Sequence, residues 1–260
     1  MLNNSKFLAF DTSTDVMSIA LTDGQRLWQH TGPGGAKAST TLIPAVLALL
    51  VEAGLALGDL RAIAFGRGPG SFSGLRTACA VAQGLAFGAN HGAGIEVLPI
   101  DTLHALAEQA RFQLPAGAHH ITAMLDARMD EMYVQRYSVN SSELTAVGLC
   151  ELIRPEDLPA KLTPDAATGL AAGDVFAGNV FDVYADRLPA NLNRLSCLPT
   201  ASAMLRLAPK LVAQGRCVHA ALALPLYVRD KVALTTDERA EVSRAKLQAA
   251  ALAASASTPL

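Results

Sequence analysis

Residues 62–76 read AIAFGRGPGSFSGLR, an apolar run, a glycine-rich segment and the beginning of an alanine-rich segment. The apolar run predicts a buried strand and the alanine-rich segment predicts a helix. Between them, Gly66, Gly68 and Gly70 allow positive φ angles, and Pro69 fixes its own φ. The pattern therefore predicts a rigid, tight turn from a strand into a helix.

A phosphate-binding role is the alternative for this turn. A P-loop needs G-x-x-x-x-G-K-[ST] and a dinucleotide site needs G-x-G-x-x-G, because both place backbone amides around phosphate oxygens. Ser71 and Ser73 stand where the third glycine of the second motif belongs, and the nearest cation is Arg76 rather than a lysine. Neither motif is present. A single anion on the first amides of the helix, with Ser71 or Ser73 as the N-cap, stays open.

Turn signals and periodicity on both sides of this stretch predict alternating strands and helices. Strands are expected at 7–10, 16–22, 25–30, 62–65 and 95–100, and helices at 39–53 and 74–88. The order strand, strand, strand, helix, strand, helix, strand is that of a ribonuclease H-like layer, in which helices pack on a mixed sheet. The predicted fold class is therefore α/β.

A weak internal repeat indicates that the second half of the chain duplicates the first. Asp11 and Asp15 follow one predicted strand, and Asp126 and Asp130 follow another with the same spacing. Further strands are expected at 121–125 and 132–137 and a helix at 201–213, whereas 152–199 receives no assignment. Residues 225–229 are expected to close the fold, and the tail after 238 is either a helical extension or disordered.

Composition limits the function classes. The chain of 260 residues is 51% hydrophobic and 17% charged, with a formal net charge of -2, which does not favour a protein that grips a phosphate backbone by itself. The N-terminal sequence lacks signal-peptide features, and no uninterrupted apolar stretch reaches roughly 18 residues, so a cytoplasmic location without a membrane span is expected. The 4 cysteines form no C-x-x-C pair, which favours reduced thiols.

Two predicted helices are more apolar than a helix with one covered face requires. In helix 39–53, Glu52 is almost alone as a charged residue, and helix 74–88 carries small residues at intervals of four. Such helices are covered either by the chain's own core or by a partner as well. The residues predicted to form a partner interface are Leu42, Ile43, Val46, Leu49, Leu50, Gly74, Thr77, Ala78, Val81, Ala82 and Leu85.

Four runs, LAFDTSTDVMSIAL, AIAFGRGPGSFSGLRTACAVAQGLAFG, LDARMDEMYVQRY and PLYVRD, resemble those of the TsaB (YeaZ) family. The match covers most of 7–138 and 225–230, and it is only general between about 140 and 224. The resemblance implies two ribonuclease H-like lobes of the actin, heat-shock and sugar kinase superfamily. The expected lobes are 1–108, with about 220–237 packing back on it, and 109–219, followed by a tail at 238–260.

The resemblance also implies a function. TsaB is a non-catalytic subunit of the bacterial machinery that makes N6-threonylcarbamoyladenosine next to the anticodon of tRNA. TsaB proteins pair through their first two helices with the catalytic relative TsaD, the pair engages the ATPase TsaE, and isolated TsaB proteins often form homodimers. Contact with tRNA is expected only through the complex. One departure is Ala38-Ser39, where the family usually has His-Ser.

Catalytic and metal-binding residues are not predicted for this chain. Thr102 and Leu106 stand where the catalytic relatives carry a metal-binding H-x-x-x-H pair. ATP is expected to be used by the complex, with weak ATP or ADP binding by this chain left open near Asp11, Thr12, Ser13, Arg67, Ser71 and Arg76. The alternatives are a stand-alone ATP-binding enzyme of the sugar kinase and ATPase group, or a peptidase-like relative, although neither H-E-x-x-H nor G-x-S-x-G occurs.

Overall fold

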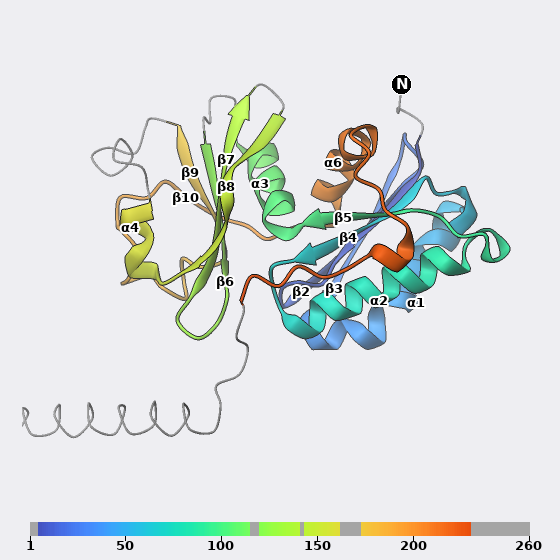
Figure 1. Ribbon diagram of the computed structural model, residues 1–260, viewed down its shortest axis with the longest axis horizontal. Helices are drawn as coiled ribbons and strands as arrows, with labels where there is room; N and C mark the ends of the chain where they lie inside the picture. Colours follow the sequence, from blue (N-terminus) through green and yellow to red (C-terminus); the bar gives the residue numbers. More distant parts are fainter. Residues whose placement is uncertain (1–4, 115–119, 141–142, 162–172, 230–260) are drawn as a thin grey trace, which may run out of the picture. The chain divides into compact units, whose positions relative to one another are not determined.

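The computed structural model describes residues 5–114, 120–140, 143–161 and 173–229. These residues form two mixed sheets, shown in Figure 1, with strand orders β3-β2-β1-β4-β5 and β10-β9-β6-β7-β8. Each sheet joins an antiparallel three-stranded meander, through its first strand, to two parallel strands. The shared topology confirms the predicted duplication and the α/β class.

The bounds of the elements follow the sequence predictions closely in the first half. The elements there are β1 (Phe7–Asp11), β2 (Val16–Thr22), β3 (Leu27–Pro33), α1 (Ala38–Ala53), β4 (Ala62–Gly68), α2 (Phe72–Gly88), β5 (Val97–Asp101) and α3 (Thr102–Gln113). Those in the second half are β6 (His120–Asp126), β7 (Met132–Asn140), β8 (Glu143–Ile153), α4 (Leu158–Lys161), β9 (Asp174–Gly178), β10 (Arg194–Ser196) and α6 (Ala201–Ala213). The predicted strands 121–125 and 132–137 and helix 201–213 are confirmed, while β8, β9 and β10 were not predicted.

The central strand β1 is buried on both faces because helices cover both sides of the first sheet. Its side chains alternate, so that Leu8 and Phe10 pack with α1 and α2, while Phe7 and Ala9 pack with α6. All four side chains are at most 1% exposed. A strand buried on both faces reads as a continuous apolar run, which is the pattern that predicted it.

Helix α6 corrects the predicted boundary between the lobes. The sequence placed 201–213 in the C-terminal lobe, but α6 contacts β1 and β2. Its residues Met204 and Ala208 share a core with Phe7, because its apolar face covers the side of the first sheet opposite α1 and α2. Helix α6 therefore belongs to the N-terminal lobe.

The described part of the chain after α6 packs on α2 and β4. The carbonyl oxygen of Ala223 accepts hydrogen bonds from Cys79 Sγ and Gln83 Nε2, both at 3.1 Å. The amide of Leu226 donates to the carbonyl oxygen of Arg67 at 2.7 Å. The predictions for 230–237 and for the tail at 238–260 lie outside the described residues.

One helical segment of the described residues, Gly35–Ala53, is long and apolar enough to cross a membrane by length and composition. Polar and charged residues interrupt this segment, so it is not the uninterrupted apolar stretch of about 18 residues that the sequence was found to lack. The apolar residues of one face, Leu42, Val46, Leu49 and Leu50, lie in the core with β1 and α2. Packing on the sheet therefore accounts for part of its apolar composition, and the exposed part is described below.

Candidate functional site

The glycine-rich turn lies directly against the loop that follows β1. A Cβ atom on Gly66 would lie 1.8 Å from Asp11 Oδ2, and one on Gly74 would lie 1.9 Å from the carbonyl oxygen of Thr12. The amide of Ser71 donates to the carbonyl oxygen of Ser13 at 2.7 Å, and Thr12 Oγ1 donates to the carbonyl oxygen of Gly74 at 2.7 Å. The glycines are needed because two backbone segments touch here.

Two details of the predicted turn need correction. Of the three glycines credited with positive φ, only Gly68 has one, at 121°. Ser71 is at the N-cap position of α2, but its side chain makes no capping hydrogen bond. Ser71 Oγ lies instead 3.4 Å from Ser73 Oγ. The Ser71 amide is already bonded to Ser13, so it is not one of the amides that could hold the anion that the sequence left open.

Asp11 is an internal carboxylate. It is 1% exposed, and it accepts hydrogen bonds from Ser13 N at 2.9 Å, Ser13 Oγ at 2.6 Å and Thr102 Oγ1 at 3.4 Å. Burial raises the pKa of Asp11 above its ordinary value of 3.8, and the hydrogen bonds oppose that shift. Thr12 and Ser13 are also buried. The carboxylate of Asp11 is therefore occupied by hydrogen bonds from within the chain.

Arg67 and Arg76, the two arginines of the opening stretch, both have partners within the chain. Arg67 forms an ion pair with Asp101 at the end of β5. The guanidinium of Arg76 lies 3.8 Å from the ring centroid of Phe72, and its Nε is 3.3 Å from Tyr227 Oη. The structure thus brings Asp11, Thr12, Ser13 and Ser71 together, whereas Arg67 and Arg76 have partners of their own.

The loop after β6 occupies the equivalent place in the second lobe. Arg128, Met129 and Asp130 follow one another with φ angles of 60°, 56° and 61°. Asp126 Oδ1 accepts from the Arg128 amide at 2.9 Å and from Tyr184 Oη at 2.8 Å. Arg128 Nη2 also lies 2.9 Å from Asp15 Oδ2, so an exposed ion pair joins the two loops.

The positions of the metal pair in the catalytic relatives do not fit a metal here. The hydroxyl of Thr102 donates a hydrogen bond to Asp11. Leu106 of α3 is fully buried in a core shared with β6. Neither side chain carries an imidazole or a carboxylate, which such a site requires. Among residues 5–114, 120–140, 143–161 and 173–229, no group of three or more His, Cys, Asp or Glu side chains is arranged to hold a metal ion.

Most of the predicted interface residues lie in the chain's own core, which corrects that prediction. Leu42, Val46, Leu49, Leu50, Gly74, Ala78 and Ala82 are buried beneath the helices, because they form the faces that pack on the first sheet. Ile43 is exposed, and Thr77, Val81 and Leu85 are partly exposed. The sequence list omitted Leu47 and Val51, which are 47% and 82% exposed.

The exposed residues of α1 nevertheless form an apolar stripe, defined here as Ile43, Leu47 and Val51. Their spacing of four residues places them on one face of the helix. Helices α1 and α2 lie side by side on the same face of the first sheet in Figure 1, and they share one core. The four-residue spacing of Ile43, Leu47 and Val51 is visible in the sequence and could have identified this stripe.

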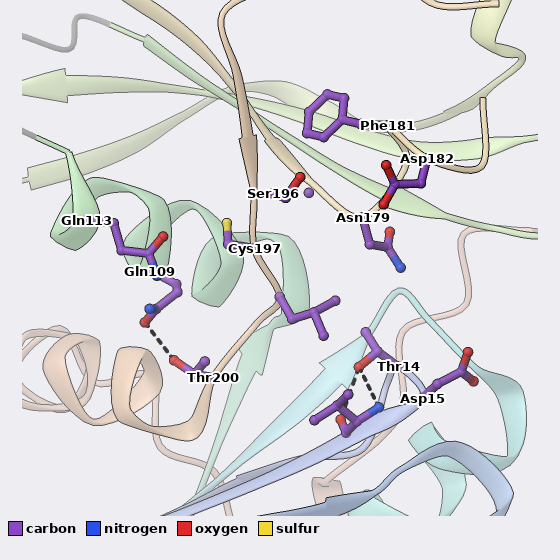
Figure 2. Close-up of a pocket in the computed structure, with 13 residues that line it drawn as sticks. Thr14, Asp15, Gln109, Gln113, Asn179, Phe181, Asp182, Ser196, Cys197 and Thr200 are labelled. Carbon is purple, nitrogen blue, oxygen red and sulfur yellow. Dashed lines mark hydrogen bonds between the residues drawn. The ribbon is translucent and has the colours of Figure 1, made fainter. Parts of the chain in front are cut away.

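A separate cavity of about 570 Å³ opens near the loop after β1. Its lining comes from the β1–β2 turn, α3, the ends of β9 and β10, and the start of α6. Figure 2 shows Gln109 and Gln113 on one side of the cavity and Asn179 and Asp182 on the other. None of these four was predicted as a site residue. Asn179 and Asp182 lie in 152–199, which had no assigned structure, and Gln109 and Gln113 belong to no motif.

The duplicated topology and the two strand-end loops define a two-lobed protein of the actin, heat-shock and sugar kinase type. Residues 33–237 match the family model described as TsaD, tRNA N6-adenosine threonylcarbamoyltransferase. The chain belongs to this family, and within it to the TsaB group of tRNA threonylcarbamoyladenosine biosynthesis proteins.

Curated relatives support this placement across nearly their whole lengths. The chain is 34% identical over 249 residues to tRNA threonylcarbamoyladenosine biosynthesis protein TsaB of Haemophilus influenzae, an alignment that covers 89% of this chain and 96% of the relative. It is 30% identical over 232 residues to the protein of the same name in Escherichia coli, with 88% and 96% covered.

A solved structure titled YeaZ from Pseudomonas aeruginosa has a similar fold. It superposes with a TM-score of 0.73 at 37% identity, covering 86% of this chain and 99% of that chain. A second structure, titled as an uncharacterized protein with similarity to peptidase YEAZ from Pseudomonas aeruginosa, gives a TM-score of 0.75 at 39% identity, covering 86% and 100%.

Proposed function

We propose that this chain is a non-catalytic scaffold subunit of the cytoplasmic machinery that forms N6-threonylcarbamoyladenosine next to the anticodon of tRNA. It pairs with a TsaD-like metalloprotein, and the pair engages a TsaE-like ATPase. The isolated chain forms a homodimer, and tRNA is contacted only through the complex. ATP is used by the complex, and binding of ATP or ADP to this chain is weak.

The observation that carries the pairing is the apolar stripe of α1. Ile43, Leu47 and Val51 are 43%, 47% and 82% exposed, although each is a large aliphatic side chain. A stripe over two helical turns beside the partly exposed Val81 and Leu85 of α2 offers a surface that a second apolar helix pair would bury. A partner of the same fold presents two such helices itself.

A non-catalytic role is supported by the burial and hydrogen bonding of Asp11 in the first loop. If the chain itself carried out ATP-dependent chemistry, Asp11 would have to face a metal or a water molecule. Its carboxylate is instead buried and bonded to Ser13 and Thr102. Thr102 and Leu106 also supply no metal ligands. These features favour a scaffold over a stand-alone enzyme of the kinase and ATPase group.

The test is a reconstitution with the TsaD-like and TsaE-like proteins of the same genome and an activated threonylcarbamoyl donor, with modified nucleoside in tRNA measured by mass spectrometry. Leu47→Arg should lower the yield at least about tenfold, because it places a charge in the buried centre of the pairing surface. The matched control is Leu149→Arg on β8, where the leucine is 87% exposed, and its yield should equal that of the unmodified chain.

A catalytic role would give a different result in the same assay. Asp11→Asn retains an oxygen that can accept from Ser13, so a scaffold with this change should support nearly full modification. A folded Asp11→Asn protein that pairs normally but supports no modification would show that the carboxylate takes part in the chemistry. That result would replace the scaffold with an enzyme.

A further inference from the structure

The cavity in Figure 2 is separate from the apolar stripe of α1, and the proposed pairing does not use it. Its size lies within the range of about 300 to 1,000 Å³ that is usual for small-molecule sites. Val16, Phe181 and Leu198 contribute apolar surface, and amide, hydroxyl and carboxylate groups contribute the rest. This mixture is typical of a site that binds a small polar molecule.

Two amide side chains of the lining have a fixed orientation. Gln109 Oε1 accepts hydrogen bonds from Thr200 Oγ1 at 2.8 Å and from Arg206 Nη2 at 3.1 Å. Asn179 Oδ1 accepts from the amide of Asp126 at 2.9 Å. Because both oxygens are used, the two NH₂ groups are the remaining donors, and neither has a partner within the described part of the chain.

The charges of the lining favour a cation over an anion. Asp15 and Asp182 are the charged lining residues in the described structure, and no lysine or arginine accompanies them. Asp15 is paired with Arg128, whereas Asp182 has no ion-pair partner among the described residues. Burial raises the pKa of the Cys197 thiol to about 11, so this lining residue adds no charge near neutral pH. A phosphate here would face the carboxylate of Asp182, which no cation of the lining compensates.

We propose that this cavity binds a small organic monocation that carries hydroxyl or carbonyl oxygens. Its ammonium or guanidinium group pairs with Asp182, and its oxygens accept hydrogen bonds from the NH₂ groups of Asn179 and Gln109. The apolar wall covers the carbon skeleton. The site is distinct from nucleotide binding, which needs cations or glycine amides around phosphates.

Glucosamine and glucose are a matched pair of probes, because they differ mainly in one amine that is protonated at about pH 6. Titration calorimetry at low ionic strength should give a dissociation constant for glucosamine near the millimolar range, and glucose should bind at least about fivefold more weakly. Asp182→Asn should weaken glucosamine binding about fivefold or more. Asp186→Asn, an exposed aspartate outside the lining, should leave it unchanged.

Three outcomes would overturn the proposal. These are equal affinities for glucosamine and glucose, unchanged glucosamine binding in Asp182→Asn, and no saturable binding at about 50 mM. Displacement of glucosamine by ATP would instead assign the cavity to a nucleotide. Asp182 lies outside the apolar stripe of α1, so Asp182→Asn should pair normally with a TsaD-like protein, and failure here would leave the proposed function intact.

Discussion

The loops after β1 and β6 stand at the same place in two sheets of identical topology, yet they are held in opposite ways. The first is buried, and its carboxylate Asp11 is enclosed between Ser13, Thr102 and the glycine-rich turn. The second is exposed and braced by Tyr184 and by ion pairs. The comparison teaches that the duplication preserved the sheet order while each lobe closed its strand-end loop by a different contact.

The largest expected effect comes from breaking the contact at the first loop. Gly74→Ala places a Cβ atom 1.9 Å from the backbone oxygen of Thr12, which no side-chain rotation relieves. We expect a loss of roughly 3 kcal/mol or more in the free energy of unfolding, because two backbone segments must separate. Denaturant unfolding followed by circular dichroism measures it.

Gly84→Ala is the control on the same helix. A Cβ atom there meets nothing within 4 Å, and the residue is exposed. Alanine should stabilise the isolated chain by about 0.5 to 1 kcal/mol, because glycine is the weaker helix former. Similar stabilities for Gly74→Ala and Gly84→Ala would refute the close contact.

A smaller loss of stability is expected from a substitution that affects the second loop. Tyr184 Oη lies 2.8 Å from Asp126 Oδ1 and 3.1 Å from the carbonyl oxygen of Glu131, so one hydroxyl ties both ends of the loop to the lobe. Tyr184→Phe should lower the free energy of unfolding by about 1 to 2 kcal/mol, since a hydrogen bond to a carboxylate is lost. Unchanged stability would mean that the loop does not depend on the hydrogen bonds of this hydroxyl.

A substitution in the left-handed backbone of the second loop should raise the free energy of unfolding rather than lower it. Met129 has a φ of 56° and a side chain that is 61% exposed. Met129→Gly should stabilise the protein by about 0.5 to 1 kcal/mol, because glycine adopts this conformation without steric cost. Met129→Ala keeps the unfavourable conformation, so a thermal melt should show no gain for it.

The smallest effect is a change in the pH dependence of stability. Burial raises the pKa of Asp11 above 3.8, so its contribution to stability is complete below that pH and is lost as the pH rises through the folded-state pKa. The free energy of unfolding of the unmodified chain, relative to that of Asp11→Asn, should therefore fall with rising pH. A difference that rises with pH would mean that the hydrogen bonds from Ser13 outweigh burial.

The sequence predicted the elements of the first half because their signals are local. Apart from β3, its strands are apolar runs bounded by turn residues, and each predicted element before residue 101 lies within about three residues of its observed bounds. Strand β8, ELTAVGLCELI, escaped prediction because its apolar residues do not alternate with polar ones, and most of its side chains are exposed. Strand β10 has three residues and is defined by pairing with β9, a contact between distant segments.

The interface prediction included buried residues for a physical reason of its own. Helix α1 is apolar on nearly all sides, so periodicity alone does not distinguish the face that packs on the sheet from the exposed face. The position of β1 and β2 settles the choice, burying Leu42 and Val46 and exposing Leu47. The cavity residues Asn179 and Asp182 were missed because tertiary contacts, rather than a motif, place them across the cavity from Gln109.

The most direct test of the scaffold proposal is the affinity of this chain for the TsaD-like protein of the same genome, measured by titration calorimetry. We predict that Leu47→Arg binds at least about 30-fold more weakly than the unmodified chain, equivalent to about 2 kcal/mol. Leu149→Arg, with its leucine exposed on the other lobe, should bind within about twofold of the unmodified chain. Equal affinities for the unmodified chain and Leu47→Arg would contradict the account.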